Sequence, residues 1–345
     1  MQTRSSRLFE SLFRSIKRDL SPFRLAGLVR RGRVQALLSL MPSTRHWLNC
    51  CRPIATVVVV IGWSAAGEAA PLTGTVVFGT GYDQSAVILP QTLGIDSGVG
   101  GASADARAEV GWQAVHNAYG RLRVLANGGY RQVDGGTFAE EQAGGAVDAS
   151  RTFGPAQMGV RINGDRRWLE STELAWNIGL SLGVTVPMDD QTARPELAVR
   201  VWHYDQQPDA NAVAVTARYR HWLPLADGDS RQRGEIAVEM TRNQADSDSE
   251  TFNELLLSVG VWGRIGPQRG SGRWDFASDC WGGLRKYHTG LREQRLLAGI
   301  AGSLDRWFDP WVALGLEARW EHLADQPDGQ DYDGIRASLR ATAAF

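Results

Sequence analysis

Residue types that commonly carry catalysis are scattered through this chain. The histidines of its later part, His116, His203, His221, His288 and His322, stand singly, and no G-x-S-x-G elbow or adjacent Ser–Asn pair accompanies them. The sequence also lacks the Cys and His spacings that hold zinc. We therefore predict a protein that is not an enzyme and that holds neither a metal nor a cofactor.

Two acidic segments could supply oxygen ligands to calcium. They are residues 246–250 (D-S-D-S-E) and 325–333 (D-Q-P-D-G-Q-D-Y-D), and neither keeps the spacing of a twelve-residue calcium loop. We interpret both as solvated surface loops. A divalent ion that bridges them to anionic lipopolysaccharide remains an alternative.

Charged residues that alternate with apolar ones are more informative. In residues 102–115, small or apolar residues take every second place, while Ser, Asp, Arg, Glu and Gln take most of the places between them. Successive side chains of a strand point to opposite faces, so this pattern predicts a strand with one apolar and one polar face.

The same alternation places a set of charged side chains on polar strand faces, which would point inward in a closed sheet. They are Arg107, Glu109, Arg121, Arg123, Arg161, Arg200, Arg218, Arg220, Glu235, Glu239, Asp275, Asp279, Glu317, Arg319, Arg336 and Arg340. Such residues either form cross-strand ion pairs that close a narrow barrel, or line a water-filled channel whose selectivity they tune. Both interpretations stay open at this point.

Fourteen segments of the chain carry strand patterns. They are residues 73–83, 102–115, 119–131, 142–152, 156–163, 173–186, 196–204, 212–222, 234–242, 254–265, 274–287, 295–305, 311–321 and 335–345. An alternating strand of about ten residues crosses a bilayer when it is tilted, and only a closed barrel pairs all of its backbone groups inside lipid. The predicted fold class is all-β, a closed antiparallel transmembrane β-barrel of about 14 strands.

Connection lengths suggest an orientation. If the chain enters from the periplasm, the connections after odd-numbered strands lie on the outer side and are the longer ones. These are residues 84–101, 133–141, 164–172, 205–211, 243–253, 288–294 and 322–334. Three connections after even strands are very short, at 116–118, 153–155 and 308–310, whereas those at 187–195, 223–233 and 266–273 are longer than the rule predicts.

Tryptophans near the predicted strand ends indicate an interfacial girdle, because amphipathic rings settle where membrane meets water. They are Trp112, Trp176, Trp202, Trp222, Trp274, Trp311 and Trp320. For any single tryptophan, ordinary packing in a core is the competing interpretation.

The first 70 residues read as a leader. They hold 11 basic and 3 acidic residues, whereas the remainder holds 26 basic and 35 acidic residues. Residues 53–63 form an apolar core that is too short for a membrane-spanning helix of about 20 residues, and small residues suited to cleavage follow at 64–70. We predict a leader with a signal peptide over 1–70, a true start at Met41, cleavage within 66–70, and a barrel over 71–345. An amphipathic or disordered cytoplasmic tail is the alternative for the first segment.

The chain contains three cysteines, which limits the disulfide bonds it can form. Cys50 and Cys51 precede the apolar core and would leave with the leader, so Cys280 is the lone thiol of the predicted mature chain. No intrachain disulfide framework is therefore available, and closure of a sheet would replace bridges as the source of stability. We interpret Cys280 as a packing residue.

The chain ends on an aromatic residue after an alternating strand. Ile335, Ala337, Leu339, Ala341, Ala343 and Phe345 share one parity. With its signal peptide and its period-two strands, the sequence resembles Gram-negative outer-membrane β-barrel proteins. That resemblance implies that Leu339, Ala341, Ala343 and Phe345 form a membrane-insertion signal that the barrel-insertion machinery reads.

Residues 77–83 (V-F-G-T-G-Y-D) and the strand number also resemble the barrel part of surface lipoprotein assembly modifiers. The chain departs from that pattern, because residues 1–70 are too few for the helical repeats that often precede such barrels. The loops carry no motif that names a partner.

Together these observations predict a passive channel or a transport-associated surface protein in the cell outer membrane. Its expected partners are outer-membrane lipids, the barrel-insertion machinery, and a small solute or an exported protein, with no nucleic acid. One alternative is a barrel that assists the export or surface assembly of another macromolecule. A second is a soluble exported β-sandwich that acts as a binding module.

Overall fold

Period-two alternation produces fourteen long strands in the computed structural model. The structure describes residues 72–345, except 85–86, 89–94, 97–99, 118, 134–137, 171, 226–230, 268–270, 290–293 and 327–330. The predicted leader, residues 1–70, lies outside the described residues. The barrel strands are β1 (Leu72–Asp83), β4 (Gly101–Asn117), β5 (Gly120–Val133), β6 (Phe138–Phe153), β7 (Ala156–Leu169), β8 (Thr172–Met188), β9 (Gln191–Tyr204), β10 (Ala212–Pro224), β11 (Gln232–Ala245), β12 (Phe252–Ile265), β13 (Arg273–Tyr287), β14 (Gln294–Trp307), β15 (Val312–Gln326) and β16 (Asp331–Ala344).

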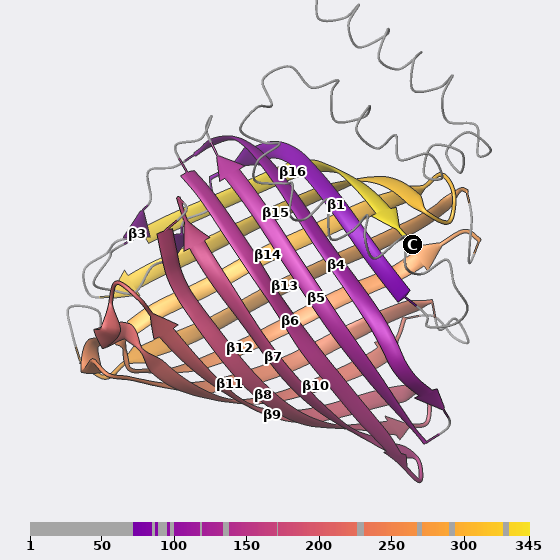
Figure 1. Ribbon diagram of the computed structural model, residues 1–345, viewed down its shortest axis with the longest axis horizontal. Coiled ribbons are helices and arrows are strands. Elements are labelled where there is room, and N and C mark those ends of the chain that lie inside the picture. The colour runs from indigo at the N-terminus through magenta and orange to yellow at the C-terminus, as the bar shows by residue number, and fades with distance from the viewer. Residues whose placement is uncertain are drawn as a thin grey trace, which may run out of the picture. The chain divides into compact units, whose positions relative to one another are not determined.

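The sheet closes on itself. Each strand pairs antiparallel with its neighbours in the sequence, and β1 pairs with both β4 and β16 (Figure 1). At the closing seam, the backbones of Gly74 and Phe345 exchange two hydrogen bonds of 3.0 Å. The predicted closed barrel of 14 strands is therefore confirmed, and the β-sandwich alternative is excluded because a sandwich keeps two open sheets.

The outer surface of the barrel is apolar. Leu180, Val199 and Val215 occupy one row across β8, β9 and β10, and all three side chains are exposed. The same strand face carries further exposed apolar side chains, among them Phe78, Ile162, Ile178, Leu197, Ile236, Leu257, Ile300, Leu316 and Leu339. Water would penalise such a surface, whereas hydrocarbon accommodates it.

The strands are long enough to cross a bilayer. They range from 12 residues in β1 to 17 residues in β4 and β8, against the roughly 9–11 residues that a tilted transmembrane strand needs. Cys280 lies on the outer face of β13 between Val259 and Ile300, and its thiol is exposed and free. In the described part of the chain, no helix is both long and apolar enough to span a membrane.

Several predicted connections prove to be mostly strand. Residues 164–172 were expected to form a connection, but β7 continues to Leu169 and β8 begins at Thr172. Residues 187–195 likewise contain only a turn at 189–190, where Asp189 adopts a φ of 55°. Pro195 lies where the pairing of β8 with β9 is interrupted between Glu196 and Ala193, a place that suits a residue without a backbone N–H.

The two rims differ less than the sequence suggested. The longest connection, 84–100, follows β1, and two-residue turns follow β4, β6 and β8. However, 225–231 and 266–272 match the length of 205–211 at the opposite rim. The orientation in the membrane therefore stays a prediction.

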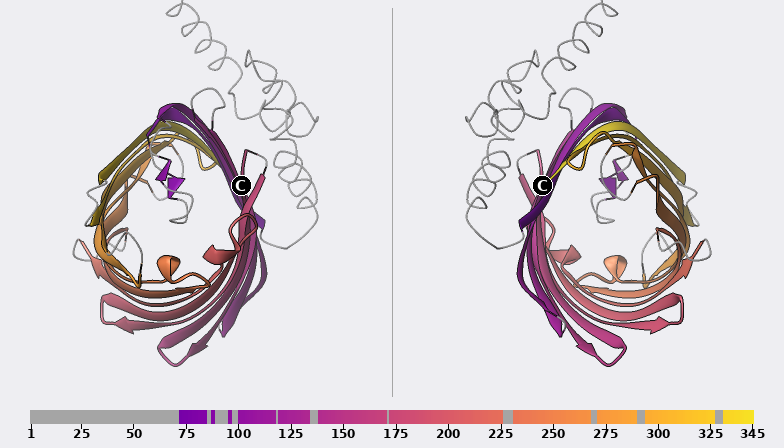
Figure 2. Two further views of the ribbon diagram at one scale, coloured as in Figure 1. Left: turned by 90° about the vertical axis from the view of Figure 1, so that its left-hand side faces the viewer. Right: turned by 90° about the vertical axis from the view of Figure 1, so that its right-hand side faces the viewer.

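Short secondary-structure elements lie in the connections at the rim where β1, β9 and β11 end. The hairpin of β2 (Val87–Ile88) and β3 (Ile95–Asp96) lies in the connection after β1. The 3₁₀ turns η3 (Pro208–Ala210) and η4 (Asp248–Glu250) follow β9 and β11. Viewed along the barrel, these elements lie inside the outline of the ring of strands (Figure 2). They therefore reduce the opening at this mouth.

Candidate functional site on the inner wall

The structure places the predicted inward-facing charges on one surface. In the strand registers, all sixteen have the parity opposite to that of the exposed apolar residues, which is the inner face of the barrel. Several lie near the middle of their strands and are still open to solvent. The side chains of Arg107 and Glu109 are 50% exposed, that of Arg161 is 49% exposed, and that of Arg319 is 48% exposed.

Many of these charges meet an opposite charge on a neighbouring strand. Arg123 Nη2 lies 3.4 Å from Glu109 Oε1, and Arg161 Nε lies 3.6 Å from Asp148 Oδ1. Arg319 pairs with Glu321 on its own strand. Because these groups are partly hydrated, each pair contributes only about 0–1 kcal/mol of stability. These ion pairs therefore contribute little to the stability of the sheet, and their main effect is to fix the positions of the charged groups on the inner wall.

Arg340 anchors a less exposed cluster, the Arg340 cluster, with Asp305 and Glu317. Its guanidinium donates to Glu317 Oε2 over 2.8 Å and to Asp305 Oδ1 over 2.8 Å, with a further short contact to Asp305 Oδ2. Asp305, Gly315 and Arg340 form one row across β14, β15 and β16. A Cβ atom at Gly315 would collide with the Asp305 carboxylate. The glycine thus lets charges two strands apart meet.

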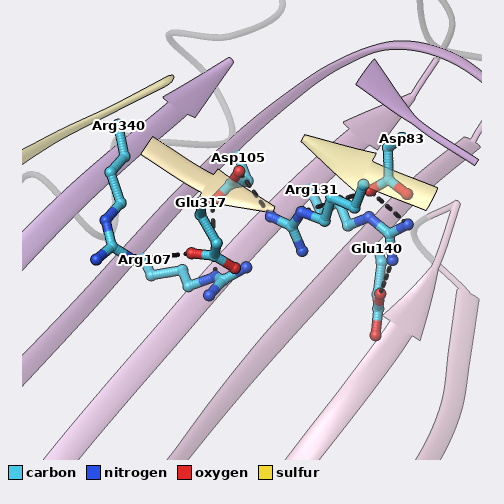
Figure 3. Close-up of polar contacts among 8 residues, drawn as sticks. Asp83, Asp105, Arg107, Arg131, Glu140, Glu317 and Arg340 are labelled. Atoms are coloured by element: carbon cyan, nitrogen blue, oxygen red, sulfur yellow. Dashed lines mark hydrogen bonds and ion pairs between the residues drawn. The ribbon is translucent and has the colours of Figure 1, made fainter. Parts of the chain in front are cut away.

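A second cluster crosses the closing seam. This seam cluster contains Asp83, Asp105, Arg107, Arg131, Glu140 and Arg336. Figure 3 labels the first five of these side chains over neighbouring strands. Asp83 is 1% exposed, and Arg131 Nη2 lies 2.7 Å from it. Arg336 Nη2 on β16 donates to Asp105 Oδ1 on β4 over 2.8 Å, across β1.

Gly79 provides the space for that crossing. It pairs with Asp105 on one side and with Arg340 on the other, and a Cβ atom there would collide with Asp105 Oδ1. The charge-assisted hydrogen bond from Arg336 therefore joins β16 to β4 across the seam, and Arg336 Nε also lies 3.7 Å from Asp83 Oδ2 on β1.

Further charged groups line both ends of the inner wall. At the end where β13 begins, Asp275 accepts from Arg264 Nε over 2.9 Å and from Trp307 Nε1 over 2.8 Å. At the opposite end, Arg285 Nε donates to Glu254 Oε2 over 2.8 Å. Polar contacts thus extend from one mouth to the other.

The acidic segment 246–250 is less solvated than the sequence suggested. Glu250 and Thr251 are buried, and the Glu250 carbonyl accepts from Asn243 Nδ2 over 3.0 Å. Thr251 Oγ1 accepts from the Ala245 backbone N–H over 3.0 Å. These contacts fix η4 against the inner wall, so the expectation of a fully solvated loop was wrong here.

Two tryptophans assigned to an interfacial girdle lie on the inner face instead. Trp222 Nε1 donates to Glu235 Oε2 over 2.6 Å. The centroid of the Trp202 ring lies 5.5 Å from the guanidinium carbon of Arg167 and 5.6 Å from that of Arg200. A polar partner on an inner strand face holds each ring away from lipid. Trp112, Trp311 and Trp320 are exposed, as a girdle requires.

Sequence reasoning missed several members of the two clusters. Asp83, Asp105 and Asp305 lie within the predicted strands 73–83, 102–115 and 295–305 and have the inner parity, so a complete reading of those alternations would have found them. Their partners depend on the strand register, for which the sequence carries no direct signal. Within the described residues, no group of three or more His, Cys, Asp or Glu side chains has the geometry of a metal site.

Comparison with known proteins finds only distant similarity to solved structures. No family model and no curated protein matches the chain. Among solved structures, the outer membrane channel DcaP of Acinetobacter baumannii is 12% identical, with 81% of this chain and 98% of that chain covered and a TM-score of 0.46. A bacterial polysaccharide outer membrane secretin is 12% identical, with 81% and 100% covered and a TM-score of 0.45. A Pseudomonas aeruginosa FadL homologue is 10% identical, with 79% and 90% covered and a TM-score of 0.43.

At these identities the solved structures assign no substrate or activity to this chain. Its own closed sheet, apolar outer face and charged inner face define a transmembrane β-barrel of the outer-membrane class. The protein is accordingly an outer-membrane protein.

Proposed function

We propose that this barrel is a passive, non-enzymatic channel for small hydrophilic solutes. The observation that carries the proposal is the hydration of charged side chains in the middle of the inner wall, where Arg107, Glu109, Arg161 and Arg319 are about half exposed. A barrel filled by its own side chains would bury these groups. Fourteen strands also enclose a wider interior than the eight-stranded barrels that side chains fill.

Selectivity for either sign of charge should be weak. The exposed inner groups include Arg161 and Arg319 as well as Glu109, and each has an opposite charge within 4 Å. Paired charges of both signs attract neither anions nor cations strongly from a distance, because each pair has no net charge and salt screens the remaining field beyond a Debye length of about 8–10 Å. Polar solutes of low net charge are therefore the favoured class.

The expected partners follow from the surface and the chain ends. The apolar outer face is suited to outer-membrane lipids. Leu339, Ala341, Ala343 and Phe345 form our candidate insertion signal for the barrel-insertion machinery, and residues 1–70 our candidate leader.

Planar-bilayer recording of the purified barrel tests the channel. We expect stepwise, ohmic conductance with a small reversal potential in a KCl gradient. Glu109→Gln should shift the selectivity toward anions, and Arg161→Gln toward cations, because each removes one exposed inner charge. Closed, silent bilayers from material that migrates as folded protein on unheated gels would refute the proposal.

A further inference from the structure

One part of the inner wall combines a hollow with charges of both signs. Its cavity volume is about 190 Å³, and it is lined by Arg218, Arg220, Glu235, Ala237, Glu239, Leu256 and Ser258. The floor consists of Ala237 and Ser258, which are paired in register on β11 and β12 and have short side chains. Charged side chains from β10 and β11 border this floor.

Two of the bordering charged residues, Arg218 and Glu239, already form an ion pair with each other. Arg218 Nε donates to Glu239 Oε2 over 2.5 Å, and Arg218 Nη1 lies 3.7 Å from Glu196 Oε1. Binding a solute ion to either group would have to compete with its partner. The two groups that remain for a ligand are Arg220 and Glu235.

Arg220 has an environment that favours an added anion. It lies directly opposite Arg194 in the pairing of β9 with β10, and like charges at opposite positions repel each other. Arg194 is 3.1 Å from Glu196. Among the contacts of the described residues, Arg220 has neither an ion pair nor a hydrogen bond, so its guanidinium is available to the lumen.

Glu235 supplies the opposite charge nearby. Its Oε2 accepts from Trp222 Nε1 over 2.6 Å, which fixes the carboxylate, while Oε1 has no partner among the described residues. Ala237, two residues along β11 from Glu235, is opposite Arg220. Glu235 and Arg220 are therefore diagonal neighbours, with Cα atoms roughly 7–8 Å apart.

From this arrangement we propose that the hollow, here named the Arg220–Glu235 site, binds small zwitterionic solutes such as α-amino acids. The solute carboxylate pairs with Arg220, its ammonium group pairs with Glu235, and its side chain lies over Ala237. The volume of about 190 Å³ corresponds to roughly six waters at about 30 Å³ each, so the hollow has room for a small amino acid. The inference rests on the proposed channel function and names its favoured solute.

Titration of the folded, detergent-purified barrel with L-alanine tests the site, with propionate and ethylamine as ligands that each carry one of the two charges. We expect alanine to bind at least about tenfold more tightly than either, since it makes both charge-assisted contacts. Arg220→Gln and Glu235→Gln should each weaken alanine binding about tenfold. Arg121→Gln is the matched control, because Arg121 is an exposed inner-wall arginine on β5, outside the hollow.

Equal affinities for alanine, propionate and ethylamine would overturn the proposal, and so would an unchanged affinity in folded Arg220→Gln protein. If that variant does not fold, the three-ligand comparison on the unaltered protein decides alone. Single-channel recording separates the two proposals. Conductance that alanine does not block refutes the Arg220–Glu235 site, whereas alanine binding by a barrel without conductance refutes the channel.

Discussion

Glycines opposite charged residues determine which ion pairs this barrel makes. Asp305 and Arg340 are separated by a full strand, and they meet because Gly315 between them has no side chain. Gly79 likewise leaves space for the Asp105 carboxylate, which accepts from Arg336 across β1. The positions of the glycines are visible in the sequence, but their alignment with charges two strands away is a property of the register. For this reason the inner parity could be predicted while the pairing could not.

Replacing Arg340 by methionine should destabilise the barrel by about 3 kcal/mol, the lower end of the cost of breaking a buried pair. The physical reason is that Asp305 and Glu317, both mostly buried, would lose their shared cation. The urea dependence of the folded band on unheated gels measures the change. The matched control is Arg319→Met, which removes a half-exposed arginine and should cost less than about 1 kcal/mol. Equal losses in the two variants would contradict this account of the Arg340 cluster.

Strand alternation was the strongest signal in the sequence, and it located all fourteen barrel strands. It failed where polar residues continue a strand. Residues 164–169 include Asp165, Arg166 and Arg167, which resemble a loop, yet the first and last of these face the polar interior. A bulge between Arg167 and Trp168 also shifts the parity there. Charged strand ends are therefore hidden from an analysis that expects loops to be polar.

The last strand combines a structural contact with a proposed recognition signal. The Phe345 ring occupies the space where Gly74 would carry a Cβ atom, on the outer face of the seam. We expect Phe345→Ser to lower assembly into the outer membrane in cells, but to leave refolding into detergent largely intact, because the ladder of β1 with β16 remains. Gly74→Val, which fills the ring's place, should impair both processes.

The folded band in cell membranes and in detergent measures the two effects. If Phe345→Ser fails equally in both settings, the residue acts in packing and the recognition role is wrong. If it assembles normally in cells, neither role is supported.

At the scale of the whole molecule, closure explains how residues 72–345 keep such an exposed apolar surface without a second layer of structure. An open sheet with this outer face would need a second layer to cover it, whereas a barrel needs only lipid. The charges then gather inside, and the short elements η3 and η4 extend into one mouth. The mean composition of the chain gives no hint of this separation, because 43% hydrophobic residues also fit a soluble globule. The alternation of apolar and polar residues along each strand predicts which side chains face lipid and which face the interior.

Cysteine accessibility at two adjacent residues of β9 tests the central claim most directly. Ala198 lies on the inner face between Ser181 and Thr216, and Val199 on the outer face between Leu180 and Val215. In a chain whose native cysteines are serine, reconstituted in lipid vesicles, a charged thiol reagent should label Ala198→Cys and leave Val199→Cys unreacted until the protein is denatured. Equal labelling of the two, or labelling of Val199→Cys alone, would contradict a barrel that meets lipid outside and water inside.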